Sequence, residues 1–369
     1  MVWCGAMYLS NFQNELSATP VPQEVGLNWL AEQHSRRSPI EKETLLKMLN
    51  RFGCGPSQIR QRRTWLPEFL NANEPGLFPT SPQSEQPSME ERSDVFQRQM
   101  GLALKNLYAQ KSLAPNYLLH VTCTGYASPS VAQELVIEKK WPTAVQHLYH
   151  MGCYAAIPAV RTAQGLLAIE KKSLIEILHT EFCTLHFNMH TTAPEQLVVQ
   201  SLFADGCIRY QATHEKPNDV PSLKVLATHE QILADSSADM TWNLANFGFA
   251  MTLSREVPQK IVQHIKPFLE HLFSKASLSL SEISNLTAAI HPGGPKIIDA
   301  VKNVLELKEE QIATSRKVLF ENGNMSSATV PFIWKDVLEN HKAASSPYVL
   351  SLAFGPGLTI AGSLLCWQA

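Results

Sequence analysis

Three side chains in this chain of 369 residues could together carry out acyl transfer. Cys153 follows a glycine in MGCYAAIPAV and precedes an alanine-rich stretch that favours a helix. His291 ends an apolar run and opens HPGGP, and Asn324 lies in GNMSS beside another glycine. A cysteine thiolate attacks an acyl carbonyl, and His and Asn donors stabilise the oxygen on which negative charge develops. The set suits chemistry that proceeds through a thioester.

Each of the three residues also has an ordinary explanation. A cysteine between Gly and Ala is more often a packed core residue, His291 could be a turn residue without a role, and Asn324 fits a helix N-cap. However, all three occur at a predicted strand-to-helix turn flanked by Gly or Pro. Ligands bind at such turns in layered α/β folds, so the sequence predicts one shared site.

The ionisation of the Cys153 thiol depends on two opposing effects. At a helix N-terminus with His291 in reach, the helix dipole and a nearby imidazolium lower the pKa of a thiol. Burial in an apolar tunnel raises it. We expect the charge effects to dominate and to keep this pKa below the ~8.5 of a free cysteine.

The elements that must position these residues alternate between strands and helices. Strands are predicted over residues 116–123, 144–152, 175–187, 196–212, 222–234, 246–254, 286–290 and 348–367. Helices are predicted over residues 88–110, 131–140, 153–168, 256–276 and 294–307, the first with a capping box formed by Ser88 and Glu91. This alternation predicts a layered α/β fold. The similar order of elements in the two halves indicates a structural duplication, with Cys153 in the first half and the other two residues in the second.

Composition excludes several classes of protein. The chain is 44% hydrophobic and 17% charged with a net charge of -2, which is globular and lacks the basic surplus of a nucleic-acid-binding protein. Neither a signal-peptide pattern nor an apolar stretch of ~20 residues occurs, so we expect a cytoplasmic protein. The seven cysteines form no CxxC pair, which disfavours a disulfide framework or a structural zinc site. Most of them are expected in the core.

Five segments carry a resemblance to a known family: MGCYAAIPA, LFADG, AIHPGGPKIIDAV, GNMSSATVPFIW and FGPGLT. In order and spacing they resemble the signature segments of type III polyketide synthases, the chalcone-synthase-like branch of the thiolase superfamily. The resemblance covers nearly all of residues 55–369. The segment MTWNLANFGFAMTLSREVP resembles the bacterial alkylpyrone and alkylresorcinol synthases more than the plant enzymes. A β-ketoacyl-carrier-protein synthase III would usually show GNTSAAS where this chain has GNMSSAT.

The resemblance implies an α/β thiolase-like fold with two duplicated α/β halves in five layers (αβαβα). Residues 1–215 would form the half that carries the nucleophile, and residues 216–369 the half that carries His and Asn. In the family, the counterpart of Cys153 takes the starter from an acyl-CoA. The counterparts of His291 and Asn324 bind the thioester carbonyl of malonyl-CoA as CO2 leaves, and the enolate extends the chain before it closes to a pyrone or phenolic ring.

The resemblance also implies a substrate pocket. Phe203 matches the family's gatekeeper phenylalanine between the CoA tunnel and the acyl cavity, and Met251 occupies the second gatekeeper position, a Phe in the plant enzymes. Trp242 occurs where plant enzymes have a small Gly, and His186 where they have a Thr. These departures reshape the cavity, so the starter and the ring pattern of the plant enzymes are not carried over.

Three arginines, Arg60, Arg62 and Arg63, occur where the family binds the phosphates of CoA with basic side chains. Arginine suits phosphate because its planar fork donates two parallel hydrogen bonds. A solvated basic patch is an equally good explanation for any single one of them. We therefore predict a CoA-binding site here without assigning the arginine that contacts a phosphate.

The resemblance implies acyl-CoA and malonyl-CoA as substrates, a homodimer, and neither a metal nor a tightly bound cofactor. An alternative is a ketosynthase-III-like condensing enzyme that takes its acyl chain from an acyl carrier protein. A second alternative, from another class, is a catalytically silent acyl-binding partner. The presence of Cys153, His291 and Asn324 argues against the second.

Overall fold

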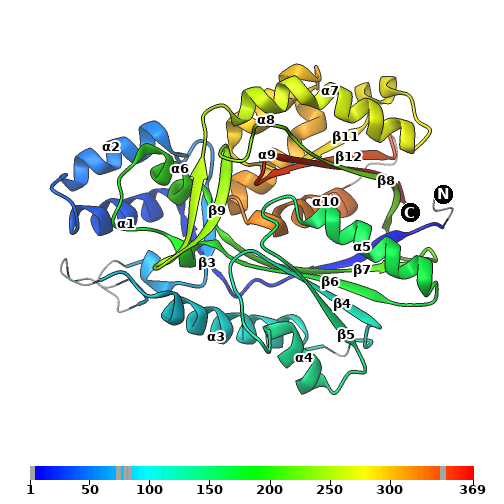
Figure 1. The fold of residues 1–369 in the computed structure, drawn as a ribbon, viewed down its shortest axis with the longest axis horizontal. Helices are drawn as coiled ribbons and strands as arrows, with labels where there is room; N and C mark the ends of the chain where they lie inside the picture. Colours follow the sequence, from blue (N-terminus) through cyan, green and yellow to red (C-terminus); the bar gives the residue numbers. More distant parts are fainter. Residues whose placement is uncertain (1–4, 72–75, 79–80, 82–84, 111, 341–345) are drawn as a thin grey trace.

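The computed structural model describes residues 5–71, 76–78, 81, 85–110, 112–340 and 346–369 (Figure 1). Its main feature is a nine-stranded sheet in the order β11-β12-β13-β8-β1-β7-β6-β4-β5. The bounds of these strands are β1 Tyr8–Asn14, β4 Tyr117–Thr122, β5 Ala144–Tyr149, β6 Ile175–Phe182, β7 Asp205–Thr213, β8 Ser222–Ile232, β11 Thr287–Ile290, β12 Tyr348–Gly355 and β13 Thr359–Gln368. No helix among the described residues has the length and apolar character needed to cross a membrane.

The sheet contains the predicted duplication. In the first half β4 runs parallel to β6, and β6 is antiparallel to β7, which is antiparallel to β1. In the second half β11 runs parallel to β12, followed by antiparallel β13 and β8 in the same way. The halves meet where two residue pairs join β1 to β8. The expected division at 215/216 falls between the end of β7 and the start of β8.

Helices cover the sheet on both sides and also separate its two halves. The main helices are α1 Gln23–Ser35, α2 Lys42–Phe52, α3 Met89–Leu107, α4 Val131–Lys139, α5 Ala156–Ile169, α6 Pro194–Leu202, α7 Val257–Lys275, α8 Pro295–Val304, α9 Glu309–Asn322 and α10 Thr329–Asn340. In Figure 1, α5 and α10 lie between the strands of the two halves, α3 and α4 lie outside one half, and α7 and α8 outside the other. All eight residues of β6 are buried as a result.

Two smaller sheets complete the fold. The hairpin of β9 (Met240–Ala245) and β10 (Gly248–Leu253) packs beside α6, and β2 (Thr19–Pro22) pairs with β3 (Gln61–Thr64). The hairpin is separate from the main sheet. Its inner side chains contribute to the site described below.

Most predicted elements are confirmed, including the Ser88–Glu91 capping box at the start of α3. The strand predicted from residue 196 is wrong in its first part, because residues 194–202 form helix α6 and the strand begins only at Asp205. The helix predicted from Cys153 begins instead at Ala156. The strands β1, β2, β3 and β9 were not predicted.

Candidate active site

Cys153 lies in the turn between β5 and α5. Gly152 makes this turn possible, because its φ of 86° disfavours any residue with a side chain. A Cβ at position 152 would also lie 2.6 Å from Cδ of Pro356, a residue of the other half. The turn therefore holds the thiol against the second half, and the Cys153 residue is only 7% exposed.

His291 directly follows β11, and its backbone N–H donates to the carbonyl of Leu352 at 2.7 Å. The residue is 1% exposed. Neither Nδ1 nor Nε2 of its ring has a hydrogen-bond partner within the described part of the chain. Buried polar groups are nearly always paired in proteins. The His291 imidazole therefore presents two open hydrogen-bonding positions at a cavity wall.

Asn324 follows α9 and Gly323, whose φ is 75°. Its backbone pairs with the first half, because the Asn324 N–H donates to the Leu202 carbonyl and the Ala204 N–H donates to the Asn324 carbonyl. Its side-chain Oδ1 accepts the Ser326 N–H at 2.9 Å. This contact fixes the orientation of the amide and leaves Nδ2 as a donor on the side of the Cys153 thiol.

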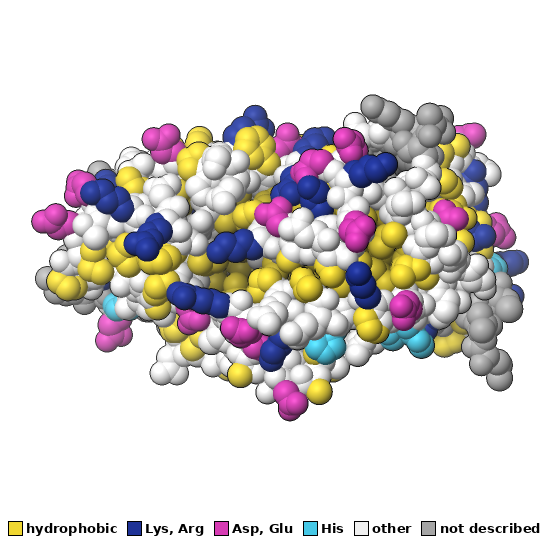
Figure 2. Space-filling model, turned by 90° about the horizontal axis from the view of Figure 1, so that it is seen from above, with side chains coloured by type: hydrophobic (Ala, Val, Ile, Leu, Met, Phe, Trp, Pro, Cys, Tyr) yellow, Lys and Arg dark blue, Asp and Glu magenta, His cyan; other side chains and the backbone are white. Residues whose placement is uncertain are grey.

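One cavity of about 990 Å³ brings the three residues together. Cys153, His291 and Asn324 all line it, although they come from three separate turns of the chain. Figure 2 shows the face above it, hollowed near the middle over hydrophobic side chains, with Lys and Arg side chains around the hollow. The sequence prediction of one shared site therefore agrees with the geometry, while the catalytic roles stay a prediction.

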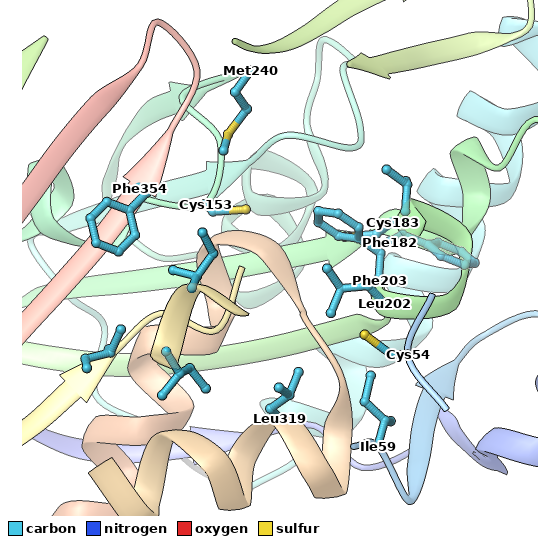
Figure 3. Packing of buried hydrophobic residues seen from close by; sticks show 14 of the residues in the cluster. Cys54, Ile59, Cys153, Phe182, Cys183, Leu202, Phe203, Met240, Leu319 and Phe354 are labelled. Carbon is cyan, nitrogen blue, oxygen red and sulfur yellow. The ribbon is translucent and has the colours of Figure 1, made fainter. Parts of the chain in front are cut away.

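A second, smaller cavity of about 40 Å³ lies beyond Cys153. The four predicted pocket residues, Phe203, Met251, Trp242 and His186, all line it. Phe203 and Met251 also line the large cavity, as does Cys153. Figure 3 shows Cys153 with Phe203, Met240 and Phe354 around it. Phe203 and Met251 thus lie where the two spaces meet, which is where a gatekeeper would act.

The three predicted CoA-binding arginines lie elsewhere. Arg62 is 4% exposed and donates to the carbonyls of Gln200 and Phe203, so it supports the segment behind the site. Arg63 donates to the Ala18 carbonyl, and Arg60 is 4.0 Å from Glu321. None of the three is among the described residues that line either cavity.

Other cations line the large cavity. They are Arg51 at the end of α2, Arg255 after β10, and Lys296 in the first turn of α8. They are accompanied there by acidic Glu195 and Asp299. Sequence reasoning missed all three cations because nothing in their local sequence indicates that they share a cavity.

Burial determines the ionisation of the catalytic candidates. It raises the pKa of the Cys153 thiol to about 12. The negative charge of Glu181 raises this pKa further, whereas hydrogen bonds to Ser326 and Asn324 lower it. Burial lowers the pKa of His291 to about 3. The expected lowering of the thiol pKa is therefore wrong. The helix begins three residues beyond the thiol, and burial lowers the pKa of His291 to about 3, so its neutral imidazole does not favour the thiolate.

A buried network behind the thiol was also missed. Ser326 adopts a left-handed backbone with φ 49°, and its Oγ lies 3.8 Å from the Cys153 Sγ. Glu181 accepts hydrogen bonds from the Cys123 N–H, the Thr124 hydroxyl and the Ser327 hydroxyl. Burial raises the pKa of Glu181 to about 7. Within the described residues, no three His, Cys, Asp or Glu side chains are grouped so that they could hold a metal ion.

Alkylation of Cys153 tests this electrostatic picture. Because the thiolate is the reactive form and its pKa is raised, iodoacetamide labelling should be slow at pH 7 and should increase through pH 9 without a plateau, with a midpoint above the ~8.5 of free cysteine. Glu181→Gln should shift the profile to lower pH, since it removes the negative charge that opposes the thiolate. Labelling is followed by intact mass, with Cys153→Ala as background. A plateau below pH 8 would contradict the raised pKa.

Comparisons with known proteins show which proteins this chain is similar to. Residues 224–367 match the family model described as "Chalcone and stilbene synthases, C-terminal domain". Over 256 residues the chain is 29% identical to "Type III polyketide synthase C" of Arabidopsis thaliana, an alignment that covers 68% of this chain and 66% of that protein. A "Putative chalcone synthase" of Bacillus subtilis (strain 168) is 28% identical over 67% of this chain and 69% of its own length. The chain is thus similar to the type III polyketide synthases.

Solved structures show that the chain shares its fold with known polyketide synthases. It superposes on PKS-I from the brown alga Ectocarpus siliculosus with a TM-score of 0.86 at 22% identity, covering 99% of both chains. It superposes on 1,3,6,8-tetrahydroxynaphthalene synthase from Streptomyces coelicolor A3(2) with a TM-score of 0.81 at 21% identity, covering 98% of this chain and 99% of that one. These likenesses confirm the predicted thiolase-like fold.

The sequence alignments leave part of some relatives uncovered. The chain spans slightly less than two thirds of the Arabidopsis protein and 8% of "Probable polyketide synthase 1" of Dictyostelium discoideum, to which it is 31% identical over 256 residues. Plant and bacterial relatives match this chain to similar extents. The bacterial branch therefore stays a prediction.

Proposed function

We propose that this protein loads an acyl starter from CoA onto Cys153 and extends it by decarboxylative condensation with malonyl-CoA, followed by cyclisation to a pyrone or phenolic ring. One observation carries the proposal. Cys153, His291 and Asn324 line one cavity in which both ring nitrogens of His291 lack a partner among the described residues. The similarity to type III polyketide synthases supports it. The direct test is incubation with acyl-CoA and malonyl-CoA, followed by mass spectrometry for an acyl adduct on Cys153 and for condensed products.

Starter loading begins from a neutral thiol and a neutral imidazole. Since the pKa of Cys153 is about 12 and that of His291 about 3, a preformed ion pair would be unfavourable. His291 therefore takes the thiol proton as sulfur attacks the acyl carbonyl, and the proton passes to the departing CoA thiolate. Asn324 Nδ2 donates to the oxygen on which charge develops.

Chain extension uses the same donors in a second way. The thioester carbonyl of malonyl-CoA accepts hydrogen bonds from His291 and from Asn324 Nδ2. As the C–C bond to the carboxylate breaks and CO2 leaves, the electron pair forms an enolate whose oxygen these donors stabilise. The enolate carbon then attacks the acyl group on Cys153, and the new C–C bond replaces the C–S bond. Buried donors are effective here because they are already oriented in a low-dielectric site.

The cations of the large cavity support CoA thioesters as substrates. We propose that Arg51 and Lys296 bind the CoA phosphates, since both line the cavity that Cys153 also lines. A hydrogen bond to a charged group contributes about 1.5–3 kcal/mol, so R51A or K296A should raise KM for acyl-CoA roughly tenfold or more with little change in kcat. Arg60→Ala is the matched control, because Arg60 is an arginine outside the cavity lining. Equal increases in KM for R60A would instead support the CoA site predicted from the sequence.

Partners and location complete the proposal. We propose a homodimer through β5, an edge strand of the main sheet whose residues are all at least partly exposed, since an unpaired edge is a template for pairing. Sedimentation analysis tests it.

The alternative of a ketosynthase-III-like enzyme fed by an acyl carrier protein is not favoured by the family, and steady-state assays with acyl-CoA and acyl-carrier-protein donors separate the two. The cytoplasmic location, the absence of a cofactor and the boundary at 215/216 stay predictions.

A further inference from the structure

A chain of buried hydrogen bonds ends at Glu181, the carboxylate behind the Cys153 thiol. His179 Nδ1 lies 3.0 Å from Ser327 Oγ, and Ser327 in turn donates to a carboxylate oxygen of Glu181. On its other side, His179 Nε2 lies 3.3 Å from the Tyr210 hydroxyl. All four residues of this chain, Tyr210, His179, Ser327 and Glu181, are fully buried. The mechanism proposed above uses none of them.

The main sheet places these side chains on one face. Residues two apart on a strand point to the same side, so His179 and Glu181 of β6 share a face. Tyr210 of β7 pairs with Ile177, which puts its ring diagonal to His179 on that face. The rings of Tyr210 and His179 are stacked, with their centroids 5.7 Å apart. Ser327, just before α10, bridges His179 and Glu181.

The direction of the chain follows from the donors that are available. A charged carboxylate only accepts hydrogen bonds, so the Ser327 hydrogen goes to Glu181 and Ser327 Oγ accepts from His179. Burial lowers the pKa of His179 to about 3, so its imidazole is neutral and carries one hydrogen. That hydrogen is on Nδ1, which leaves Nε2 to accept from the Tyr210 hydroxyl. Every hydrogen in the chain then points toward Glu181.

The opposite direction is less favourable. A protonated Glu181 could donate to Ser327, and each later bond would reverse until His179 Nε2–H donated to the Tyr210 oxygen. The Tyr210 hydroxyl would then lack an acceptor, because His179 is its only hydrogen-bond partner within the residues that the structure describes. Leaving a buried hydroxyl unpaired costs free energy. The chain therefore favours the charged form of Glu181, against the burial that raises its pKa to about 7.

The charge on Glu181 acts on the titratable groups around it. The side chains that face it from the neighbouring segments are three thiols and a phenol, those of Cys123, Cys153, Cys183 and Tyr126. Each of them becomes negative when it ionises, so a negative carboxylate opposes its ionisation. The carboxylate itself accepts its hydrogen bonds from uncharged groups. The charge state of Glu181 therefore helps to determine how readily the Cys153 thiol ionises.

We propose that Tyr210 and His179 are positioning residues for Glu181. Through Ser327 they keep its carboxylate charged, and this charge holds the Cys153 thiol in its neutral form. The inference rests on the proposed function, in which Cys153 is the nucleophile. Neither Tyr210 nor His179 is among the described residues that line the two cavities, so both act through other residues. A neutral thiol reacts slowly with electrophiles and oxidants, so the chain protects the nucleophile before a substrate binds.

Infrared titration of the Glu181 carboxyl group tests this inference directly. The band of the protonated carboxyl is identified as the one that Glu181→Gln removes, and the pH midpoint at which it disappears is measured. Tyr210→Phe removes only the hydroxyl and should raise this midpoint by roughly half a unit or more, the effect of one neutral hydrogen bond. His179→Leu removes both bonds of the imidazole and should raise it further. His179→Asn, whose amide can still donate to Ser327, should recover part of the difference.

The pH profile of Cys153 alkylation gives a second readout. In the wild type, the logarithm of the iodoacetamide rate should rise less steeply around the midpoint of Glu181, because the thiol becomes harder to ionise as the carboxylate forms. Glu181→Gln should remove this shallow region, and Tyr210→Phe should move it to higher pH. In the Glu181→Gln background, Tyr210→Phe should cause no further change, which separates the chain from a merely structural role.

Tyr108 supplies the matched control. It is also a fully buried tyrosine, and its hydroxyl donates to Glu176, another carboxylate of β6. Tyr108→Phe should therefore leave the Glu181 titration unchanged. Thermal unfolding shows which variants fold, and if one of Tyr210→Phe and His179→Leu does not, the other is compared with Tyr108→Phe.

The outcomes separate this inference from the proposed function. An unchanged Glu181 titration in folded Tyr210→Phe, or an equal shift in Tyr108→Phe, would overturn the inference and leave the proposed function intact. Neither readout uses a substrate. Absence of loading with every acyl-CoA would therefore overturn the proposed function and leave the titration result standing.

Discussion

Replacing Cys153 with alanine is expected to abolish both starter loading and condensation. The sulfur is the nucleophile, and a nucleophile and its partners act as a unit, so the loss of rate should be about 10⁴-fold or more. The fold should survive, because the substitution removes one buried atom, comparable to a methylene worth ~0.8 kcal/mol. Product formation by chromatography, the starter adduct by intact mass and the thermal unfolding midpoint measure the three expectations separately.

Other buried cysteines serve as controls for this result. Cys207 is fully buried in β7 and is not among the described residues that line either cavity, so Cys207→Ala should keep its activity. Cys123 is also buried, at 3% exposed, but it lines the inner cavity and its Sγ accepts the Gly152 N–H at 3.0 Å. Cys123→Ala should therefore be tolerated less well than Cys207→Ala. Undiminished product from C153A in a folded enzyme would refute the assignment of the nucleophile.

The sequence was sufficient to predict the strand-to-helix turns that carry Cys153 and His291. The same prediction was wrong for Asn324, which lies between the helices α9 and α10. Gly152 and Gly323 both have positive φ values, which residues with a side chain disfavour. A glycine at such a position is therefore a local sign of a turn. Strand-to-helix turns at one edge of a layered sheet converge on one place. Cys153, His291 and Asn324 were for this reason predicted to share a site before their contacts were known.

The same reasoning fails where a residue's role depends on distant neighbours. Nothing in the local sequence distinguishes Arg62 from Arg60 and Arg63. Arg62 is nevertheless buried, and its guanidinium donates to the carbonyls of Gln200 and Phe203, which are distant in the sequence. The pKa of Cys153 was expected to fall because the helix that follows it can be predicted from the local sequence. The burial that instead raises this pKa depends on residues of the other half of the fold.

Helix α6 shows a signal that was present but overlooked. Its segment QLVVQSL contains β-branched residues that favour a strand. However, Pro194 occupies the first turn and Glu195 follows it, and both are typical of a helix start. Placing α6 correctly also matters for the site, because its C-terminal end leads directly to Phe203.

Replacing His291 or Asn324 with alanine is expected to slow the decarboxylation of malonyl-CoA by about a hundredfold to a thousandfold each. Loss of a single oxyanion donor costs roughly 2.7–4 kcal/mol in the transition state. Release of CO2 from malonyl-CoA measures this step without any starter. Since His291 is neutral with a lowered pKa of about 3, its imidazole stays neutral from pH 6 to 9, and the wild-type rate of this step should not follow a histidine titration in that range.

The conservative variants separate donation from packing. His291→Gln keeps an N–H donor in the cavity and should recover part of the lost rate, whereas Asn324→Asp replaces the donor with a carboxylate and should recover none. Asn324 also joins the two halves through its backbone, but that contact uses main-chain atoms and survives each substitution. Starter loading gives a second readout. If His291 accepts the Cys153 proton, H291A should slow loading as well as decarboxylation, while N324A should affect loading less, because the thiol proton still has its acceptor. Wild-type decarboxylation rates in both alanine variants would show that neither side chain stabilises the enolate.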